Sequence, residues 1–153
     1  MPYTYEYPRP AVTVDAVIFR KNESGLDILL IQRKHSPFQG MWALPGGFLD
    51  MNETPDEAVA RELEEETGLS GVKLIQFYTF GAIDRDPRHR TITVAYYGLL
   101  QKHNISICSG DDASDADWFP INKLPELAFD HKEIITKAKN ILKSDNEYFS
   151  KYH

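Results

Sequence analysis

The sequence contains a single cysteine, Cys108, among its 153 residues, so no disulfide can form within one chain. That usage is typical of proteins that work in a reducing compartment. No apolar run approaches the roughly 18 to 20 residues that a membrane-spanning helix needs. The N-terminus also lacks the charged start and apolar stretch of a signal peptide. We therefore expect a cytoplasmic protein that has no membrane partner.

Positive charge is also scarce. Lys and Arg number 17 against 23 Asp and Glu, which gives a formal net charge of -6. Proteins that bind nucleic acid by electrostatics need a basic face, so we expect no nucleic-acid partner. The sequence shows no internal repeat, low-complexity tract or linker, and its length suits one domain spanning residues 1–153.

The pattern of strand-like and helix-like segments predicts an α/β (α+β) fold with helices packed on a mixed sheet. Residues 11–20 and 27–34 are rich in β-branched and apolar residues and predict a hairpin. Two longer strands are expected over 72–83 and 90–101, joined by the polar loop DRDPRH. A short strand or two is expected within 105–119, around a GDDASDAD loop.

Two helices are indicated by the residues at their ends. The first is expected over 55–67, because Thr54 begins a T-x-x-E capping box and Gly68 supplies a C-terminal stop. The second is expected over about 131–143, with Asp130 as its N-cap.

The first of these helices carries a stripe of carboxylates. Glu62, Glu65 and Glu66 lie three and four residues apart, beside the apolar face of the helix. Like charges at this spacing destabilise a helix by about 0.2–0.5 kcal/mol per pair, and only Arg61 is nearby to compensate them. A hard divalent cation such as Mg²⁺, which prefers oxygen ligands, would compensate the stripe. A solvated acidic face is the alternative interpretation.

Two glycines, Gly46 and Gly47, precede this helix. Such a pair lets the backbone approach a ligand closely and expose a carbonyl group, although an ordinary tight turn is the simpler explanation. Glu53, between the glycines and the helix, could fold back onto Arg61 and tie the loop to the helix.

Together these residues resemble the signature box of the Nudix hydrolases. The matching positions are Gly47, Glu53, Arg61, Glu62, Leu63, Glu65, Glu66, Gly68 and Leu69. The resemblance implies an α/β/α sandwich around a mixed central β-sheet. It also implies hydrolysis of a nucleoside diphosphate linked to another moiety, with Glu53 and Arg61 as a structural ion pair.

The same resemblance implies the metal ligands. Glu62, Glu65 and Glu66 would bind Mg²⁺ or Mn²⁺, with help from the carbonyl group of Gly46. Metal ions neutralise the charge of a diphosphate and lower the pKa of a bound water.

A general base is expected as well. Similar enzymes place it either on a glutamate of the box, here Glu65 or Glu66, or on an acidic residue in a later loop. The later candidates are Asp111 and Asp112, and we favour Asp112. An ordinary polar turn is the alternative for this GDDASD segment.

Arginines are the candidates for substrate binding. Arg85 and Arg88 belong to a compact basic cluster in the loop DRDPRHR, and Arg33 stands near the end of the second strand. Guanidinium groups match the oxygens of phosphate. The alternatives are a solvated loop with an Asp84–Arg85 pair, and a surface position for Arg33.

The RDPR loop and the segments GDDASDADWFP and LPELAFDHKEII resemble the ADP-ribose pyrophosphatase branch of the family. That resemblance implies cleavage of ADP-ribose to AMP and ribose 5-phosphate. The same segments resemble the Nudix domain of regulators of NAD metabolism, so a nucleotide- or sugar-phosphate-sensing module without catalysis is an alternative. Sanitation of oxidised nucleoside triphosphates is another.

Aromatic residues are the candidates for stacking on the base of the nucleotide. The sequence offers Tyr3, Tyr5, Tyr7, Phe38, Trp42 and Phe80, without favouring one. Similar pyrophosphatases are usually homodimers, and the aromatic N-terminus could supply an exchanged strand to such an assembly.

Overall fold

The computed structural model describes residues 2–100 and 113–152. The strands and helices, in chain order, are β1 (Ala11–Asn22), β2 (Gly25–Arg33), β3 (Trp42–Ala43), β4 (Gly46–Phe48), α1 (Pro55–Thr67), β5 (Ile75–Phe80), β6 (Thr91–Leu100), β7 (Ala113–Pro120) and α2 (His131–Tyr152). The predicted α/β (α+β) class, with a mixed sheet and two helices, is confirmed.

The strands form one sheet with the order β3-β2-β1-β6-β5, in which β4 also pairs with β1 and β7 with β2. Two antiparallel hairpins follow the sequence prediction, β1 with β2 and β5 with β6. The central pair is parallel, because β1 and β6 run side by side from Ala11–Thr91 to Arg20–Leu100. The sheet is therefore mixed.

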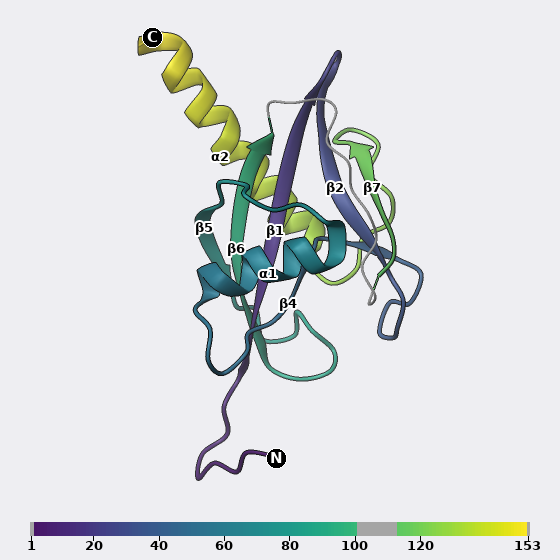
Figure 1. The fold of residues 1–153 in the computed structure, drawn as a ribbon, viewed down its shortest axis with the longest axis vertical. Coiled ribbons are helices and arrows are strands. Elements are labelled where there is room, and N and C mark those ends of the chain that lie inside the picture. The colour runs from purple at the N-terminus through teal and green to yellow at the C-terminus, as the bar shows by residue number, and fades with distance from the viewer. Residues whose placement is uncertain (1, 101–112, 153) are drawn as a thin grey trace.

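Each face of the sheet is covered by one helix (Figure 1). Successive side chains of a strand point to opposite faces. In β1, Val14 and Ile18 belong to a core cluster shared with residues of α1. Val17 and Phe19 belong to the cluster shared with residues of α2. The alternation produces the α/β/α sandwich expected from the sequence.

Helix α1 has the predicted bounds because its ends are set locally. The hydroxyl group of Thr54 accepts the N–H of Glu57 at 3.1 Å, and the Glu57 side chain accepts the N–H of Thr54 at 3.3 Å. At the other end Gly68 adopts a φ of 77°, a left-handed conformation that glycine adopts without strain.

The largest differences from the predicted lengths are in α2 and β5. Helix α2 continues to Tyr152, beyond the predicted end at 143, and no glycine or proline follows in the sequence to stop it. Strand β5 covers only Ile75–Phe80 of the predicted 72–83, and Val72 and Leu74 before it pack against the core cluster on the α1 side. Within the described ranges, no helix has the length and hydropathy to cross a membrane.

Candidate active-site cleft

A cleft of about 510 Å³ lies where the ends of several elements meet. It is lined by residues that are far apart in the sequence: Asp15 of β1, Arg33 of β2, Gly46 of β4, Glu66 of α1, Arg88 of the β5–β6 loop and His131 of α2. Carboxylate and guanidinium groups thus share one cleft, an arrangement suited to a ligand that carries phosphates and a cation.

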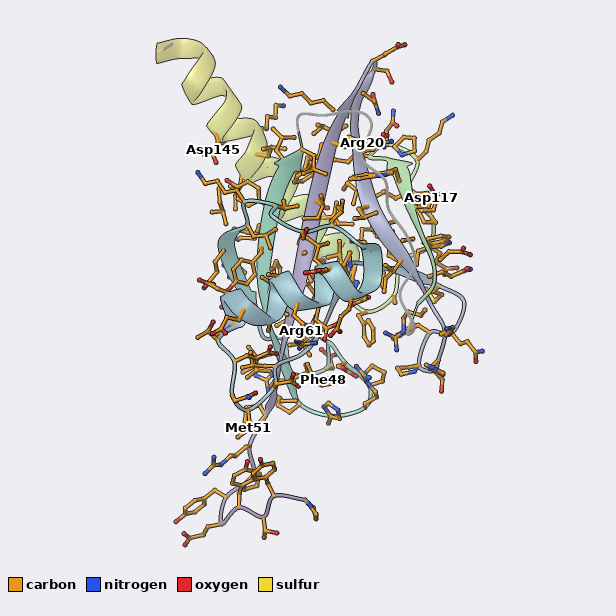
Figure 2. All side chains as sticks on the ribbon, viewed as in Figure 1. Arg20, Phe48, Met51, Arg61, Asp117 and Asp145 are labelled. Carbon is orange, nitrogen blue, oxygen red and sulfur yellow. The ribbon has the colours of Figure 1, made fainter. Side chains whose placement is uncertain are left out.

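Arg61 connects α1 to the loop after β4. Its Nε and Nη2 donate to the two carboxylate oxygens of Glu53, at 2.9 and 2.6 Å. Its Nη1 donates to Glu62 Oε1 at 2.9 Å and to Glu65 Oε2 at 3.2 Å. The Nη2 also donates to the carbonyl oxygen of Phe48 at 3.3 Å. Figure 2 labels Arg61 and Phe48 next to each other beside α1. The loop and the acidic stripe are therefore held by one side chain.

The pairing of Glu53 with Arg61 predicts a dependence of stability on pH. The Arg61 hydrogen bonds, followed by the N–H of Asp50, lower the pKa of Glu53 from 4.5 to about 2. A carboxylate whose pKa is depressed in the folded state stabilises the fold above its unfolded-state pKa, and loses that contribution as the pH falls through the folded-state value. The difference in unfolding free energy between the wild type and Glu53→Gln should therefore be largest above about pH 4.5. It should decrease as the pH falls toward about 2.

Denaturant unfolding at a series of pH values measures this difference. Glu64→Gln is the matched control, because Glu64 is exposed on the same helix. A stability difference for Glu53→Gln that stays constant between pH 5 and pH 2 would contradict the pairing.

The two glycines of β4 lie so close to other groups that an added Cβ would force a neighbouring group to move. A Cβ at Gly46 would lie 2.1 Å from the carbonyl oxygen of Val14, and one at Gly47 would lie 2.5 Å from Glu62 Oε1. The N–H of Gly46 donates to Glu66 Oε1 at 3.1 Å. The β4 backbone is therefore in direct contact with the carboxylates of α1.

The three carboxylates of the stripe differ in their surroundings. Glu66 is only 5% exposed, whereas the side chain of Glu65 is 55% exposed. Burial, followed by the neighbouring Glu62 carboxylate, raises the pKa of Glu66 to about 10, and burial also raises the pKa of Glu62. Two adjacent carboxyl groups that are costly to charge are expected where a cation would supply the opposite charge.

In the part of the chain that the structure describes, no three acidic, histidine or cysteine side chains are gathered closely enough to hold a metal ion. Glu62 and Glu65 instead point toward Arg61. The donors nevertheless fit Mg²⁺, which typically uses one or two carboxylates together with substrate phosphates. Glu62 and Glu66 line the cleft beside Gly46 and supply these hard oxygen donors.

Two arginines of the β5–β6 loop, Arg85 and Arg88, each have an acidic partner. Arg85 is nearly buried, and its Nε and Nη2 donate to the carboxylate of Asp130 at 2.9 and 2.7 Å. Its partner is thus Asp130 and not Asp84, the pairing considered from the sequence. Arg88 pairs with Asp86 at 2.8 Å and keeps 34% of its side chain exposed. Both arginines line the cleft, and Arg88 is the more accessible to a ligand.

Arg33 and Arg88 approach the same aromatic ring, that of Phe129. Their guanidinium carbons lie 4.9 and 5.4 Å from its centroid, and Arg88 also lies 5.2 Å from the ring of Phe48. Burial, followed by the charge of Arg88, lowers the pKa of Arg33. The backbone of Phe129 has a φ of 53°, which costs about 1–3 kcal/mol in a residue other than glycine. Two cations and two aromatic rings therefore share this side of the cleft.

Sequence reasoning missed several residues of the cleft. Phe48 and Phe129 are absent from the predicted stacking candidates, although Phe48 directly follows the glycine pair. Of those candidates, Trp42 and Phe80 pack against the core on the α2 side. Asp112, the favoured general base, lies outside the described residues, as does Asp111.

Asp15 and His131 were also missed, and both line the cleft. The Thr93 hydroxyl group donates to Asp15 Oδ2 at 2.6 Å, and burial raises the pKa of Asp15 to about 7. The Nδ1 of His131 accepts the N–H of Leu44 at 2.9 Å, and burial lowers the pKa of His131 to about 3. The available signal was a carboxylate inside the apolar strand VTVDAVIF.

Comparison with known proteins agrees with this geometry. The NUDIX domain family model matches residues 9–138. The chain is 45% identical over 129 residues to an ADP-ribose pyrophosphatase of Methanocaldococcus jannaschii, covering 84% of this chain and 73% of that protein. It is 34% identical over 149 residues to the ADPR responsive transcriptional repressor NtrR of Acinetobacter baylyi, covering 94% of this chain but 58% of the repressor.

A solved structure matches this chain over most of its length. It is the NUDIX domain of Shewanella oneidensis NrtR complexed with ADP ribose, with a TM-score of 0.83 and 35% identity. The match covers 89% of this chain and 90% of that one. The chain therefore belongs to the Nudix hydrolase family as a Nudix pyrophosphohydrolase, and it resembles the ADP-ribose pyrophosphatase branch.

Proposed function

We propose that the chain hydrolyses ADP-ribose to AMP and ribose 5-phosphate with a bound Mg²⁺ or Mn²⁺. The observation that carries this proposal is a single cleft that joins the carboxylates of Glu62 and Glu66 to the guanidinium groups of Arg33 and Arg88. A diphosphate needs both, because its oxygens bind arginine directly and share a metal ion with carboxylates. The named activity of the Methanocaldococcus relative supports the choice of substrate.

In this proposal Glu62, Glu65 and Glu66 hold the metal ion together with the carbonyl group of Gly46. A bound metal ion supplies charge neutralisation at the diphosphate and a more acidic water. Arg61 and Glu53 keep the β4 loop at a fixed distance from α1, as their hydrogen bonds show. Rotation of Glu65 from Arg61 into the cleft would complete the ligand set.

The reaction is hydrolysis of the bridge between the two phosphorus atoms. Arg33 and Arg88 bind and orient the diphosphate, so that water attacks one phosphorus in line with the departing phosphate oxygen. The proton of the attacking water passes to a carboxylate, for which Glu65, Glu66 and Asp112 are the candidates. One P–O bond forms and one breaks, which gives AMP and ribose 5-phosphate.

Phe48 and Phe129 are proposed to contact the adenine base. Both line the cleft, and both lie beside the Arg88 guanidinium. Aromatic faces bind a purine by stacking, and an arginine over the ring adds a cation–π contact.

A substrate panel tests the choice of ADP-ribose. Purified protein with Mg²⁺ is expected to turn over ADP-ribose with the highest kcat/KM among ADP-ribose, other ADP-sugars, dinucleoside polyphosphates and dNTPs. The panel includes an oxidised dNTP for the sanitation alternative. Turnover of triphosphates alone, with release of pyrophosphate, would contradict the proposal.

A second candidate is a module that binds ADP-ribose without cleaving it. It is favoured by the similarity to NtrR of Acinetobacter and to the ADP-ribose-bound domain of Shewanella NrtR. The two candidates differ in one measurement on the same sample. A module of this kind raises its melting temperature with ADP-ribose and releases no AMP in the presence of Mg²⁺.

A further inference from the structure

Asp15 and His131 have no part in the hydrolysis proposed above, although both line the cleft. Their side chains are 8% and 6% exposed, which is an unfavourable position for polar groups that lack partners. Each side chain accepts one hydrogen bond from within the protein, Asp15 from the hydroxyl group of Thr93 and His131 from the N–H of Leu44. These contacts leave one polar atom of each side chain directed toward the other.

The hydrogen bond from Leu44 decides the protonation of the imidazole ring. Because Nδ1 accepts the Leu44 N–H, the neutral ring carries its proton on Nε2. Burial favours the neutral ring and keeps the pKa of His131 at about 3. The Nε2–H is therefore a donor, and it lies 3.6 Å from Asp15 Oδ1.

The separation of these two atoms indicates the kind of ligand. At 3.6 Å they are farther apart than the usual 2.7–3.2 Å of an N–H···O hydrogen bond. A hydroxyl group can contact both at once, accepting from Nε2–H and donating to Oδ1. A phosphate offers acceptors alone and would be repelled by a carboxylate, whereas a metal ion would be repelled by the N–H donor.

The start of α2 is fixed independently of this pair. Arg85 holds the Asp130 carboxylate with two hydrogen bonds, and the carbonyl group of Asp130 accepts the N–H of Ile134 at 3.2 Å. His131 follows Asp130 directly, so its ring is placed by a buried ion pair and by the Leu44 backbone. A binding pair that is fixed in advance loses little freedom when a ligand arrives.

We propose that Asp15 and His131 form a subsite for a sugar hydroxyl group of the substrate, with Asp15 Oδ1 as acceptor and His131 Nε2–H as donor. The inference rests on the proposed function, because it takes the ligand to be a nucleoside diphosphate sugar. ADP-ribose contains two riboses, and a hydroxyl group of either one has the required chemistry. The RDPR loop and the LAFDHKEII segment, which supply Arg85 and His131, thereby gain a role in selecting the substrate.

Binding of the two halves of the substrate tests the subsite and identifies the ribose. Affinities for AMP and for ribose 5-phosphate are measured by NMR-detected titration with Mg²⁺, for the wild type, Asp15→Asn and His131→Asn. Asparagine at position 131 places an amide oxygen near the site of Nδ1, where it can still accept the Leu44 N–H. We expect each variant to bind one of the two fragments about 10- to 100-fold more weakly and to bind the other unchanged.

Tyr97→Phe is the control for the loss of a hydrogen bond elsewhere, because the Tyr97 hydroxyl group donates to Asp145 at 2.7 Å and Tyr97 does not line the cleft. It should lower the melting temperature and leave both affinities within about twofold of the wild type. Equal losses for both fragments in Asp15→Asn, or no loss for either, would overturn the subsite.

If AMP is the affected fragment, 2′-deoxy-AMP and 3′-deoxy-AMP locate the hydroxyl group. The Asp15→Asn penalty should vanish for one of them. An equal penalty for all three nucleotides would attribute the contact to the base and overturn the inference. Failure of the proposed function has a different signature, since the wild type would then release no AMP from ADP-ribose in the presence of Mg²⁺, whatever its affinities for the two fragments.

Discussion

Replacement of Glu66 by glutamine should lower kcat for ADP-ribose hydrolysis by about 100-fold or more, because the carboxylate that we propose as a ligand to the metal ion loses its charge. Glutamine has nearly the same shape, and its amide oxygen can still accept the N–H of Gly46, which Glu66 Oε1 accepts at 3.1 Å. The fold should therefore survive. Steady-state kinetics with Mg²⁺ in excess, together with thermal unfolding, separate lost chemistry from lost structure.

The neighbouring glutamates provide the comparisons for this variant. Glu65→Gln should also lose most of its activity, because Glu65 is proposed to turn into the cleft. Glu64→Gln is the negative control, since Glu64 is exposed on the same helix and should keep the wild-type kcat. Wild-type activity in Glu66→Gln would show that the metal assignment is wrong.

A methyl group at position 46 should destabilise the protein and impair the same site. In Gly46→Ala the new Cβ would lie 2.1 Å from the carbonyl oxygen of Val14 and 2.6 Å from Asp15 Oδ1. Because the first obstacle is backbone, β4 must move away from β1, where Gly46 is paired with Asp15. We expect a loss of about 1–3 kcal/mol in the free energy of unfolding, typical of overpacking.

Activity should fall further in Gly46→Ala than the loss of stability explains, because the displaced backbone carries the carbonyl group that we assign to the metal ion. Gly81→Ala is the matched control, since the nearest atoms to its Cβ lie 3.9 Å away. Denaturant unfolding and kinetics are compared for the two variants. Equal behaviour of the two would contradict the close approach of β4 to β1.

The sequence predicted those elements whose limits are set by neighbouring residues. Helix α1 was predicted at about its observed bounds because Thr54 and Gly68 act within one turn of its ends. Helix α2 continues past its predicted end because no glycine or proline follows Lys143 to stop it. The parallel pairing of β1 with β6 had no local signal, since it joins strands separated by α1 and β5.

The residues of the candidate site also fall into two groups, those close together in the sequence and those brought together only by the fold. Glu53, Arg61 and the glutamate stripe belong to one segment, whose spacing identifies the family before any folding is considered. Asp15 and His131 come from opposite ends of the chain and meet only because β1 and the start of α2 border one cleft. Arg85 looked like a substrate ligand in its basic loop, and its pairing with Asp130 depends on that same tertiary arrangement.

Metal-dependent hydrolysis is tested most directly by identifying the products from ADP-ribose, with Mg²⁺ and with excess chelator. Equal amounts of AMP and ribose 5-phosphate are expected with Mg²⁺, and none when the metal ion is removed. Equal product formation in chelator would contradict the metal-dependent mechanism. Binding of ADP-ribose without any product in Mg²⁺ would contradict hydrolysis itself.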